Sequence, residues 1–211
     1  MIELMLVRHG NTFAPGDRIV WVGSGEDLPL VPSGRAQARL LGDALSAAKW
    51  TATAALSGGL KRQAEHLRLA TGGTPAPIVH RALNEVDYGD WGGRTTDEIV
   101  AAHGDAAVRG WNERSQWPAD AGWPETLEAV RARVGEFAEE VASGQHGDRV
   151  LVCSSNGLLR WFLGLVPGAL EAAIEGSSFK VKTGHVGRME WRDGEGWQVA
   201  SWNQPPTASV H

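Results

Sequence analysis

Short apolar runs along the chain alternate with longer segments whose apolar residues recur at helical spacing. Strands are predicted at four such runs, residues 4–7, 52–56, 78–79 and 149–153, and the first of them is expected to be buried. Near the end of the chain, residues 185–191 and 197–202 flank a Gly-rich turn and predict a closing hairpin. The sheet is therefore expected to contain parallel strands together with an antiparallel pair.

Helices are predicted between these strands at residues 33–48, 60–70 and 127–141, with a further helix that contains residues 158–163. Ser33 is the predicted N-cap of the first helix. The apolar face of that helix is predicted to comprise Ala36, Leu40, Leu41, Ala44, Leu45 and Ala48. Strands that alternate with helices predict an α/β fold, a three-layer α/β/α sandwich around a mostly parallel central sheet. The length suits a single domain, residues 1–211.

Composition and charge exclude several classes of partner. The 20 basic and 25 acidic residues give a formal net charge of -5, which argues against nucleic-acid and anionic membrane partners. The single cysteine, Cys153, lies in an apolar run and is expected to be a buried, inert thiol, so a reducing compartment is favoured. The N-terminus carries Glu3 where a signal peptide would be basic, and no apolar run is long enough to span a membrane. A soluble, cytoplasmic protein is expected.

The first predicted strand ends on residues 8–12, which read Arg-His-Gly-Asn-Thr. Open α/β sheets bind their ligands at such strand ends. This segment resembles the signature of the histidine phosphatase superfamily, whose fold is phosphoglycerate mutase-like. Four more segments resemble the family in the same order, residues 30–38, 57–62, 83–93 and 150–160. A lone Arg-His-Gly would be a weak signal, whereas five segments in order are specific.

The resemblance implies roles for four residues. His9 corresponds to the nucleophile, Arg8 and Arg62 to phosphate-binding arginines, and Glu85 to the proton donor. The chemistry is consistent with these roles, because a transferring phosphoryl group spreads negative charge over three oxygens that guanidinium groups can bind. Arginine charge also lowers the pKa of His9 and keeps a lone pair free for attack near neutral pH. No metal and no organic cofactor is expected.

Two departures from the family pattern affect the phosphate site. Pro15 stands where relatives often have an Asn that contacts phosphate, and Asn11 is a candidate substitute. Asn11 and Thr12 are both expected to bind phosphate. Ser155 stands where the family has its second catalytic histidine. We expect Ser155 and Asn156 to act as neutral phosphate donors, because they occupy the site's own segment. The alternative is an imidazole from elsewhere in the chain, for which His185 is the candidate.

The expected substrate is a small-molecule phosphomonoester, hydrolysed through a phosphohistidine. Mutases of the superfamily carry Arg-His where this chain has Val86-Asp87, which favours a phosphatase. One alternative is a non-catalytic or weakly catalytic protein that binds a phosphate ligand. A second alternative is a mutase-type phosphotransferase.

Two segments rich in Gly and Pro, residues 13–27 and 109–125, are predicted to cover the pocket and to select the organic part of the substrate. Four tryptophans in them are predicted to line it, Trp21, Trp111, Trp117 and Trp123. His66, four residues after Arg62, shares its helix face and could reach the site, but a surface position is favoured for it. The other histidines are likewise expected to be surface or structural residues, namely His80, His103, His146 and His211. Their spacing, and that of the carboxylates, indicates no metal site.

Overall fold

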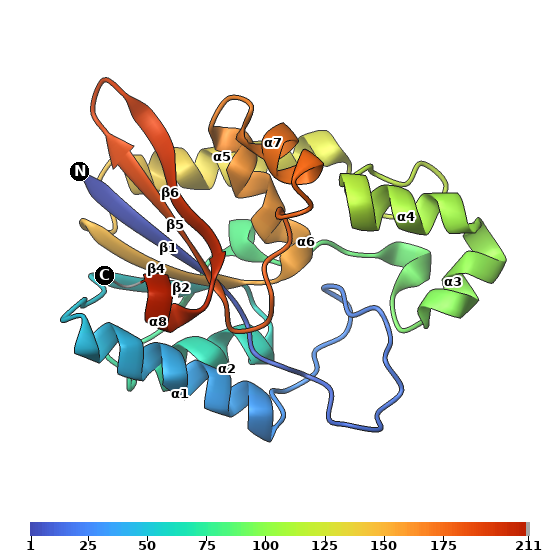
Figure 1. The fold of residues 1–211 in the computed structure, drawn as a ribbon, viewed down its shortest axis with the longest axis horizontal. Coiled ribbons are helices and arrows are strands. Elements are labelled where there is room, and N and C mark those ends of the chain that lie inside the picture. Colours follow the sequence, from blue (N-terminus) through green and yellow to red (C-terminus); the bar gives the residue numbers. More distant parts are fainter. Residues whose placement is uncertain (210–211) are drawn as a thin grey trace.

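The computed structural model describes residues 1–209, and its six strands form one sheet in the order β3-β2-β4-β1-β5-β6 (Figure 1). The strands are β1 (Ile2–Arg8), β2 (Ala54–Ser57), β3 (Ile78–Val79), β4 (Arg149–Ser154), β5 (Val186–Arg192) and β6 (Gly196–Gln204). Strands β3, β2, β4 and β1 are parallel neighbours, and β5 and β6 complete the sheet as an antiparallel pair. The predicted mostly parallel sheet with a closing hairpin is confirmed.

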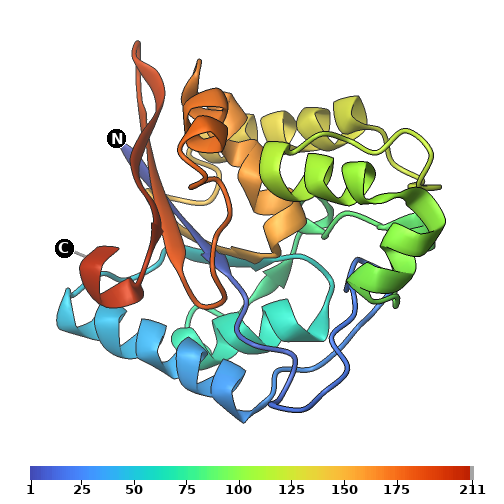
Figure 2. The ribbon, with the colours of Figure 1, turned by 45° about the vertical axis from the view of Figure 1, so that its right-hand side comes forward.

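Helices cover both faces of the sheet (Figures 1 and 2). One face carries α1 (Pro32–Ala47) and α2 (Lys61–Ala70), and the other carries α5 (Leu127–Ala142), α6 (Asn156–Leu159) and α7 (Ala169–Glu175). Alternate residues of β1 serve the two cores, because side chains of a strand point to opposite faces in turn. Met5 belongs to the same core as Leu41 of α1, and Leu6 belongs to the same core as Phe137 of α5. The three-layer arrangement is therefore confirmed.

The start of α1 differs from the prediction. The helix begins at Pro32, and Val31 is its N-cap residue with no side-chain hydrogen bond, so the predicted Ser33 cap is wrong. Proline is well placed at the first helical position, where no backbone N–H is needed. The buried face also differs, because Ala36 and Leu40 are exposed and Gly34, Ala38, Leu41, Ala44 and Leu45 are buried.

A close backbone contact explains this rotation of α1. A Cβ atom at Gly34 would lie 2.2 Å from the carbonyl oxygen of Asn11, and one at Gly10 would lie 2.3 Å from the carbonyl oxygen of Gly34. The helix therefore turns its glycine toward the segment that follows β1. The amide N–H of Asn11 donates to Oε1 of Gln37, one turn further along the helix (2.8 Å).

Two helices that the apolar pattern did not predict extend beyond the sheet, α3 (Thr96–His103) and α4 (Asp105–Arg114) (Figure 1). A capping box between Thr95 and Glu98 begins α3. Residues 109–125 are consequently not one loop, because their first part belongs to α4. The remaining elements are α8 (Pro206–Ser209) and three 3-10 helices, η1 (Arg81–Leu83), η2 (Gly89–Trp91) and η3 (Arg160–Leu165).

Cys153 lies inside β4 and is fully buried, as predicted, and burial raises the pKa of its thiol well above the ordinary value. Such a thiol carries little thiolate and is a poor nucleophile. Within residues 1–209, no helix is long and apolar enough to cross a membrane.

Candidate active site

A cavity of about 330 Å³ opens where β1 and β4 end. Nine residues predicted from the sequence line it, Arg8, His9, Asn11, Thr12, Trp21, Glu85, Trp111, Ser155 and Asn156. Residues that the sequence analysis did not single out complete the wall, Phe13, Ile19, Val20, Val22, Tyr88, Thr96, Asn112, Arg160 and Thr183. Polar groups therefore gather at the strand ends, and residues 13–22 supply most of the apolar wall.

His9 is held as a neutral imidazole with its lone pair on Nε2. Its Nδ1 lies 2.8 Å from the carbonyl oxygen of Gly10, which only accepts hydrogen bonds, so Nδ1 carries the proton. Nε2 in turn accepts a hydrogen bond from Nε of Arg62 (3.2 Å). Burial lowers the pKa of His9 well below its ordinary value, and the charges of Arg62 and Arg8 lower it further.

Arg62, in the first turn of α2, lies behind His9 and is not among the residues that line the cavity. Besides its bond to His9, it donates from Nη1 to the carbonyl of Glu26 (2.5 Å) and from Nη2 to the carbonyl of Gly23 (2.9 Å). The expected proximity of Arg62 to His9 is therefore present. Each of its nitrogens is already hydrogen-bonded within the protein.

Arg8 lines the cavity directly. Nη1 donates to the carbonyl of Val181 (2.9 Å), while Nε is buried without a partner among the described residues. Burial lowers the pKa of Arg8, and Glu85 opposes that effect. Arg8 thus remains a cation that has donors to offer an anion in the cavity.

Glu85 is 3% exposed and lies across the same cavity. Its Oε1 accepts from the amide of Val86 (2.8 Å) and its Oε2 from the amide of Gly157 (3.1 Å). Burial raises the pKa of this carboxyl despite these bonds and the charge of Arg62. A buried carboxyl with a raised pKa is suited to proton donation.

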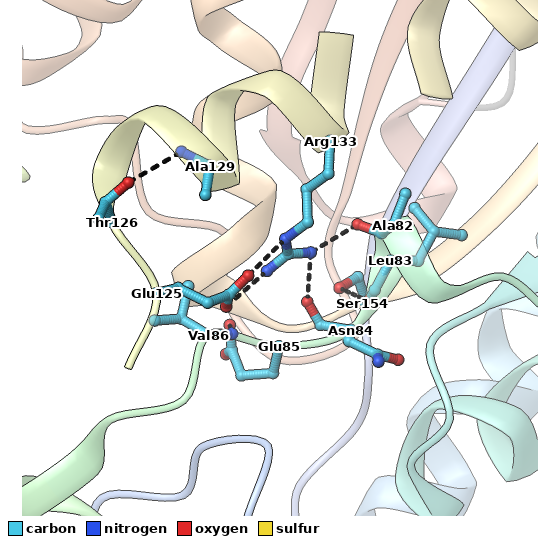
Figure 3. Close-up of polar contacts among 10 residues, drawn as sticks. All are labelled: Ala82, Leu83, Asn84, Glu85, Val86, Glu125, Thr126, Ala129, Arg133 and Ser154. Carbon is cyan, nitrogen blue, oxygen red and sulfur yellow. Dashed lines mark hydrogen bonds and ion pairs between the residues drawn. The ribbon is translucent and has the colours of Figure 1, made fainter. Parts of the chain in front are cut away.

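The backbone that precedes Glu85 is tied to α5 by hydrogen bonds (Figure 3). Arg133 of α5 donates from Nη1 to the carbonyls of Ala82 (2.6 Å) and Asn84 (2.8 Å). The same guanidinium forms a two-pronged ion pair with Glu125. Arg133 therefore fixes the segment that presents Glu85, and the sequence analysis did not identify it.

Ser155 lies in the cavity wall where relatives have a second histidine. It is 2% exposed, and its Oγ accepts from Nε2 of Gln63 (2.9 Å), so its hydroxyl proton is free to be donated. Asn156 accepts from the amide of Val181 (2.9 Å) through Oδ1. His185 instead donates from Nδ1 to the carbonyl of Asn203 (3.1 Å) and is not among the lining residues. The geometry thus places Ser155 and Asn156, and not His185, in the site.

His66 is a correction to the sequence analysis, which expected a surface residue. It is fully buried in α2, and its Nδ1 accepts from the amide of Gly10 (3.0 Å). Burial lowers the pKa of His66 to about 3. The face of α2 that carries Arg62 packs beneath the segment after β1, which buries this histidine as well.

The other histidines lie away from the cavity. His80 and His146 both bind the carboxylate of Glu140 (3.1 and 2.6 Å). His103 packs near the ring of Trp91, and His211 lies outside the described residues. Among residues 1–209, no three His, Cys, Asp or Glu side chains are grouped so that they could hold a metal ion.

The four predicted tryptophans divide into two pairs. Trp21 and Trp111 line the cavity, as predicted. Trp117 and Trp123 do not, because their rings pack edge-to-face against each other with centroids 4.8 Å apart. Trp123 also packs on Trp111 (4.9 Å), so the second pair supports the wall from behind.

An α/β/α sandwich with an arginine-flanked, neutral histidine at a strand end defines the histidine phosphatase class of fold and site. The sequence profile of the histidine phosphatase superfamily (branch 1) matches residues 4–205, and the chain belongs to this superfamily. A 2,3-bisphosphoglycerate-dependent phosphoglycerate mutase from Methylobacterium radiotolerans is 32% identical over 190 residues, which cover 86% of this chain and 85% of the mutase.

Solved structures of related proteins have the same fold. A mycobacterial glucosyl-3-phosphoglycerate phosphatase is 25% identical with a TM-score of 0.74, over 97% of this chain and 100% of that one. The α-ribazole phosphatase from Shigella flexneri has a TM-score of 0.78 at 23% identity, over 96% of each chain. At that identity the second likeness concerns the fold alone.

Proposed function

We propose that this protein is a metal-independent phosphomonoesterase that acts through a phosphohistidine on a small organic phosphate. The observation that carries the proposal is the juxtaposition of a neutral His9, with its lone pair on Nε2, and the buried carboxyl of Glu85 in one cavity. A nucleophile and an acid on the two sides of a phosphoryl group are what an in-line transfer requires.

In the first step, Nε2 of His9 attacks phosphorus and the bond between phosphorus and the ester oxygen breaks. Glu85 gives its proton to the departing oxygen, so the leaving group departs as a neutral alcohol. The raised pKa of Glu85 keeps the proton available for this transfer. Arg8 and the hydroxyl of Ser155 stabilise the charge on the phosphoryl oxygens.

In the second step, the carboxylate of Glu85 takes a proton from a water molecule that attacks the phosphohistidine. The bond between phosphorus and Nε2 breaks, and its electron pair returns to the imidazole. Inorganic phosphate leaves, and both His9 and Glu85 regain their starting protonation states. Glu85 is thus the general acid in the first step and the general base in the second, so no other titrating group is needed.

Arg62 has a distinct part in this scheme. Its Nε–H donates to the lone pair on Nε2 of His9 (3.2 Å), which holds the ring in the reactive tautomer. Attack requires that lone pair, so the Nε–H transfers its hydrogen bond to a phosphoryl oxygen when substrate enters. Arg62 would then serve as the second phosphate-binding arginine without a large movement of α2.

Two relatives' activities bear on the choice of acceptor. The similar protein from Methylobacterium radiotolerans is a mutase, whereas the similar mycobacterial protein is a phosphatase. This chain has Val86 and Asp87 where mutases of the superfamily carry a basic pair. Transfer to water is therefore favoured over transfer to an acceptor alcohol.

The test is hydrolysis of 4-nitrophenyl phosphate by the parent protein and by His9→Ala, followed by acid-labile phosphate trapping on the protein. Turnover that His9→Ala abolishes, with an acid-labile phosphoprotein in the parent only, supports the proposal. Phosphate binding without turnover would support a binding protein instead. Phosphate appearing on an added alcohol in preference to water would support a mutase.

A further inference from the structure

Arg160 is a cation in the cavity that the proposed reaction does not use. It is the first residue of η3 and is 1% exposed, yet it lines the same cavity as His9. Its guanidinium carbon lies 4.0 Å from the ring centroid of Trp111 and 5.0 Å from that of Phe179. Two aromatic faces therefore fix the plane of the guanidinium.

The hydrogen bonds of Arg160 all go to neutral groups. Nε donates to the carbonyl of Asn156 (3.2 Å), and Nη1 donates to the carbonyl of Trp111 (3.1 Å) and to Oγ of Ser115 (3.3 Å). Within the described part of the chain, Nη2 has no hydrogen-bond partner and no Asp or Glu forms an ion pair with the group. A buried guanidinium that forms no ion pair is unfavourable, and its free Nη2 can bind an anion from outside.

The position of Arg160 relates it to the leaving group and not to the phosphoryl group. Nε of Arg160 donates to the carbonyl of Asn156 (3.2 Å), and the amide of the next residue, Gly157, donates to Oε2 of Glu85 (3.1 Å). Glu85 protonates the leaving oxygen in the proposed reaction, so Arg160 lies toward the organic part of the substrate.

The charge balance of the cavity also leaves Arg160 without an anion to offset it. A phosphoryl dianion offsets Arg8 and Arg62, and Glu85 is neutral when it is ready to donate. Lys180 adds positive charge nearby, with its Nζ 3.0 Å from Oδ1 of Asn112 in the cavity wall. Burial and the charge of Arg160 lower the pKa of Lys180 to about 8.

We propose that Arg160 is a specificity-determining residue that binds a carboxylate on the leaving group of the substrate. This inference rests on the proposed phosphatase function and names its substrate class, a phosphomonoester of a hydroxy acid. Ile19, Val20 and Trp21 form an apolar wall of the same cavity, so the part of the substrate between phosphate and carboxylate has apolar surface.

The experiment compares 4-(carboxymethyl)phenyl phosphate with its uncharged isostere, 4-(carbamoylmethyl)phenyl phosphate. The methylene group keeps the two leaving oxygens similar in acidity, so their difference reports the carboxylate. We expect the parent protein to favour the carboxylate by roughly 10- to 100-fold in kcat/KM, the range of a charge-assisted hydrogen bond. A ratio near one in the parent would overturn the proposal.

Arg160→Met should bring the ratio close to one, and Arg160→Lys, which keeps the buried charge but loses the planar fork, should lower it several-fold. Arg131→Met is the matched control, because Arg131 also stacks on a tryptophan, Trp161 (5.3 Å), but lies outside the cavity. The control should retain the parental ratio. A ratio that survives in both Arg160 variants would assign the preference to another group and overturn the proposal.

A binding measurement separates this inference from the phosphatase proposal. Calorimetric titration with 4-(carboxymethyl)benzylphosphonate and its carboxamide needs no turnover. If neither ester is hydrolysed, the phosphatase proposal fails, and a tenfold tighter binding of the carboxylate phosphonate would still support the role of Arg160. Equal binding of the two phosphonates would refute that role even in an active enzyme.

Discussion

Replacing His66 with phenylalanine should alter the dependence of protein stability on pH. His66 is fully buried and its pKa is lowered to about 3, whereas the ordinary value is 6.5. The unfolded chain therefore binds a proton at this residue between pH 6.5 and pH 3, and the folded protein does not. Protonation at His66 accordingly does not affect stability above its ordinary pKa, and stability falls as the pH decreases below that value.

The magnitude follows from the two pKa values. On going from pH 8 to pH 5, His66 should remove about 2 kcal/mol from the free energy of unfolding. The Phe variant lacks this proton-linked loss. At pH 8, however, it leaves the buried amide of Gly10 without an acceptor, which should destabilise it by about 1–3 kcal/mol. The stabilities of the two proteins should therefore converge as the pH falls.

The measurement is urea denaturation at pH 8 and pH 5, followed by tryptophan fluorescence. The difference between the two proteins isolates His66, because His9 and the other titrating groups are common to both. Parallel loss of stability in the parent and in His66→Phe would refute a neutral, buried His66.

The same variant should also affect turnover. His66 fixes the amide of Gly10, whose carbonyl in turn holds Nδ1 of His9. A nucleophile misplaced by about 1 Å loses on the order of 100-fold in rate. His66→Asn, which keeps an acceptor near the Nδ1 position, should recover part of kcat. Equal kcat in the parent and in His66→Phe would show that this hydrogen bond does not position the nucleophile.

Three further outcomes are expected. Glu85→Gln should lower kcat by roughly 10²- to 10⁴-fold and abolish the alkaline limb of the pH–rate profile, which in the parent falls as the pH rises through the elevated pKa of Glu85; a retained limb would assign it to another group. Gln63→Leu should reduce kcat by roughly tenfold because the Ser155 hydroxyl loses its orienting donor, whereas His185→Ala should change kcat less than twofold. A larger loss of kcat in His185→Ala than in Gln63→Leu would restore His185 as the substitute imidazole. Dialysis against EDTA should leave turnover of 4-nitrophenyl phosphate unchanged, and a loss that Mg²⁺ or Zn²⁺ restores would contradict a metal-independent reaction.

The parts of the site that were predictable from the sequence are those encoded by local pattern. Arg8 and His9 directly follow an apolar run that predicts a strand, and the segment that contains Glu85 resembles a specific pattern of the family. The spacing of Arg62 and His66 on α2 also placed them on one face. Their burial depends on the packing of α2 beneath the Gly10 segment, which no local pattern records, and so His66 was assigned to the surface.

Other features depended on long-range contacts in the same way. Trp111, Trp117 and Trp123 cannot be distinguished by residue type, and only the packed structure shows that Trp111 alone of these three lines the cavity. Arg160 follows the predicted strand by a few residues, but its lack of a counter-ion is a property of the fold. By contrast, α3 was missed although its start carries a local signal, because Thr95 and Glu98 have the spacing of a capping box.

The contact between Gly10 and Gly34 has a consequence for mutational tolerance. Because backbone meets backbone there, no side chain fits at either position, whatever its polarity. In a saturation library, glycine alone should persist at both sites even under selection for folding without activity, whereas His9 and Glu85 should accept other residues under that selection. Invariance of the two glycines would then reflect the packing of α1 on the end of β1. Invariance of His9 and Glu85 would instead reflect a requirement for catalysis.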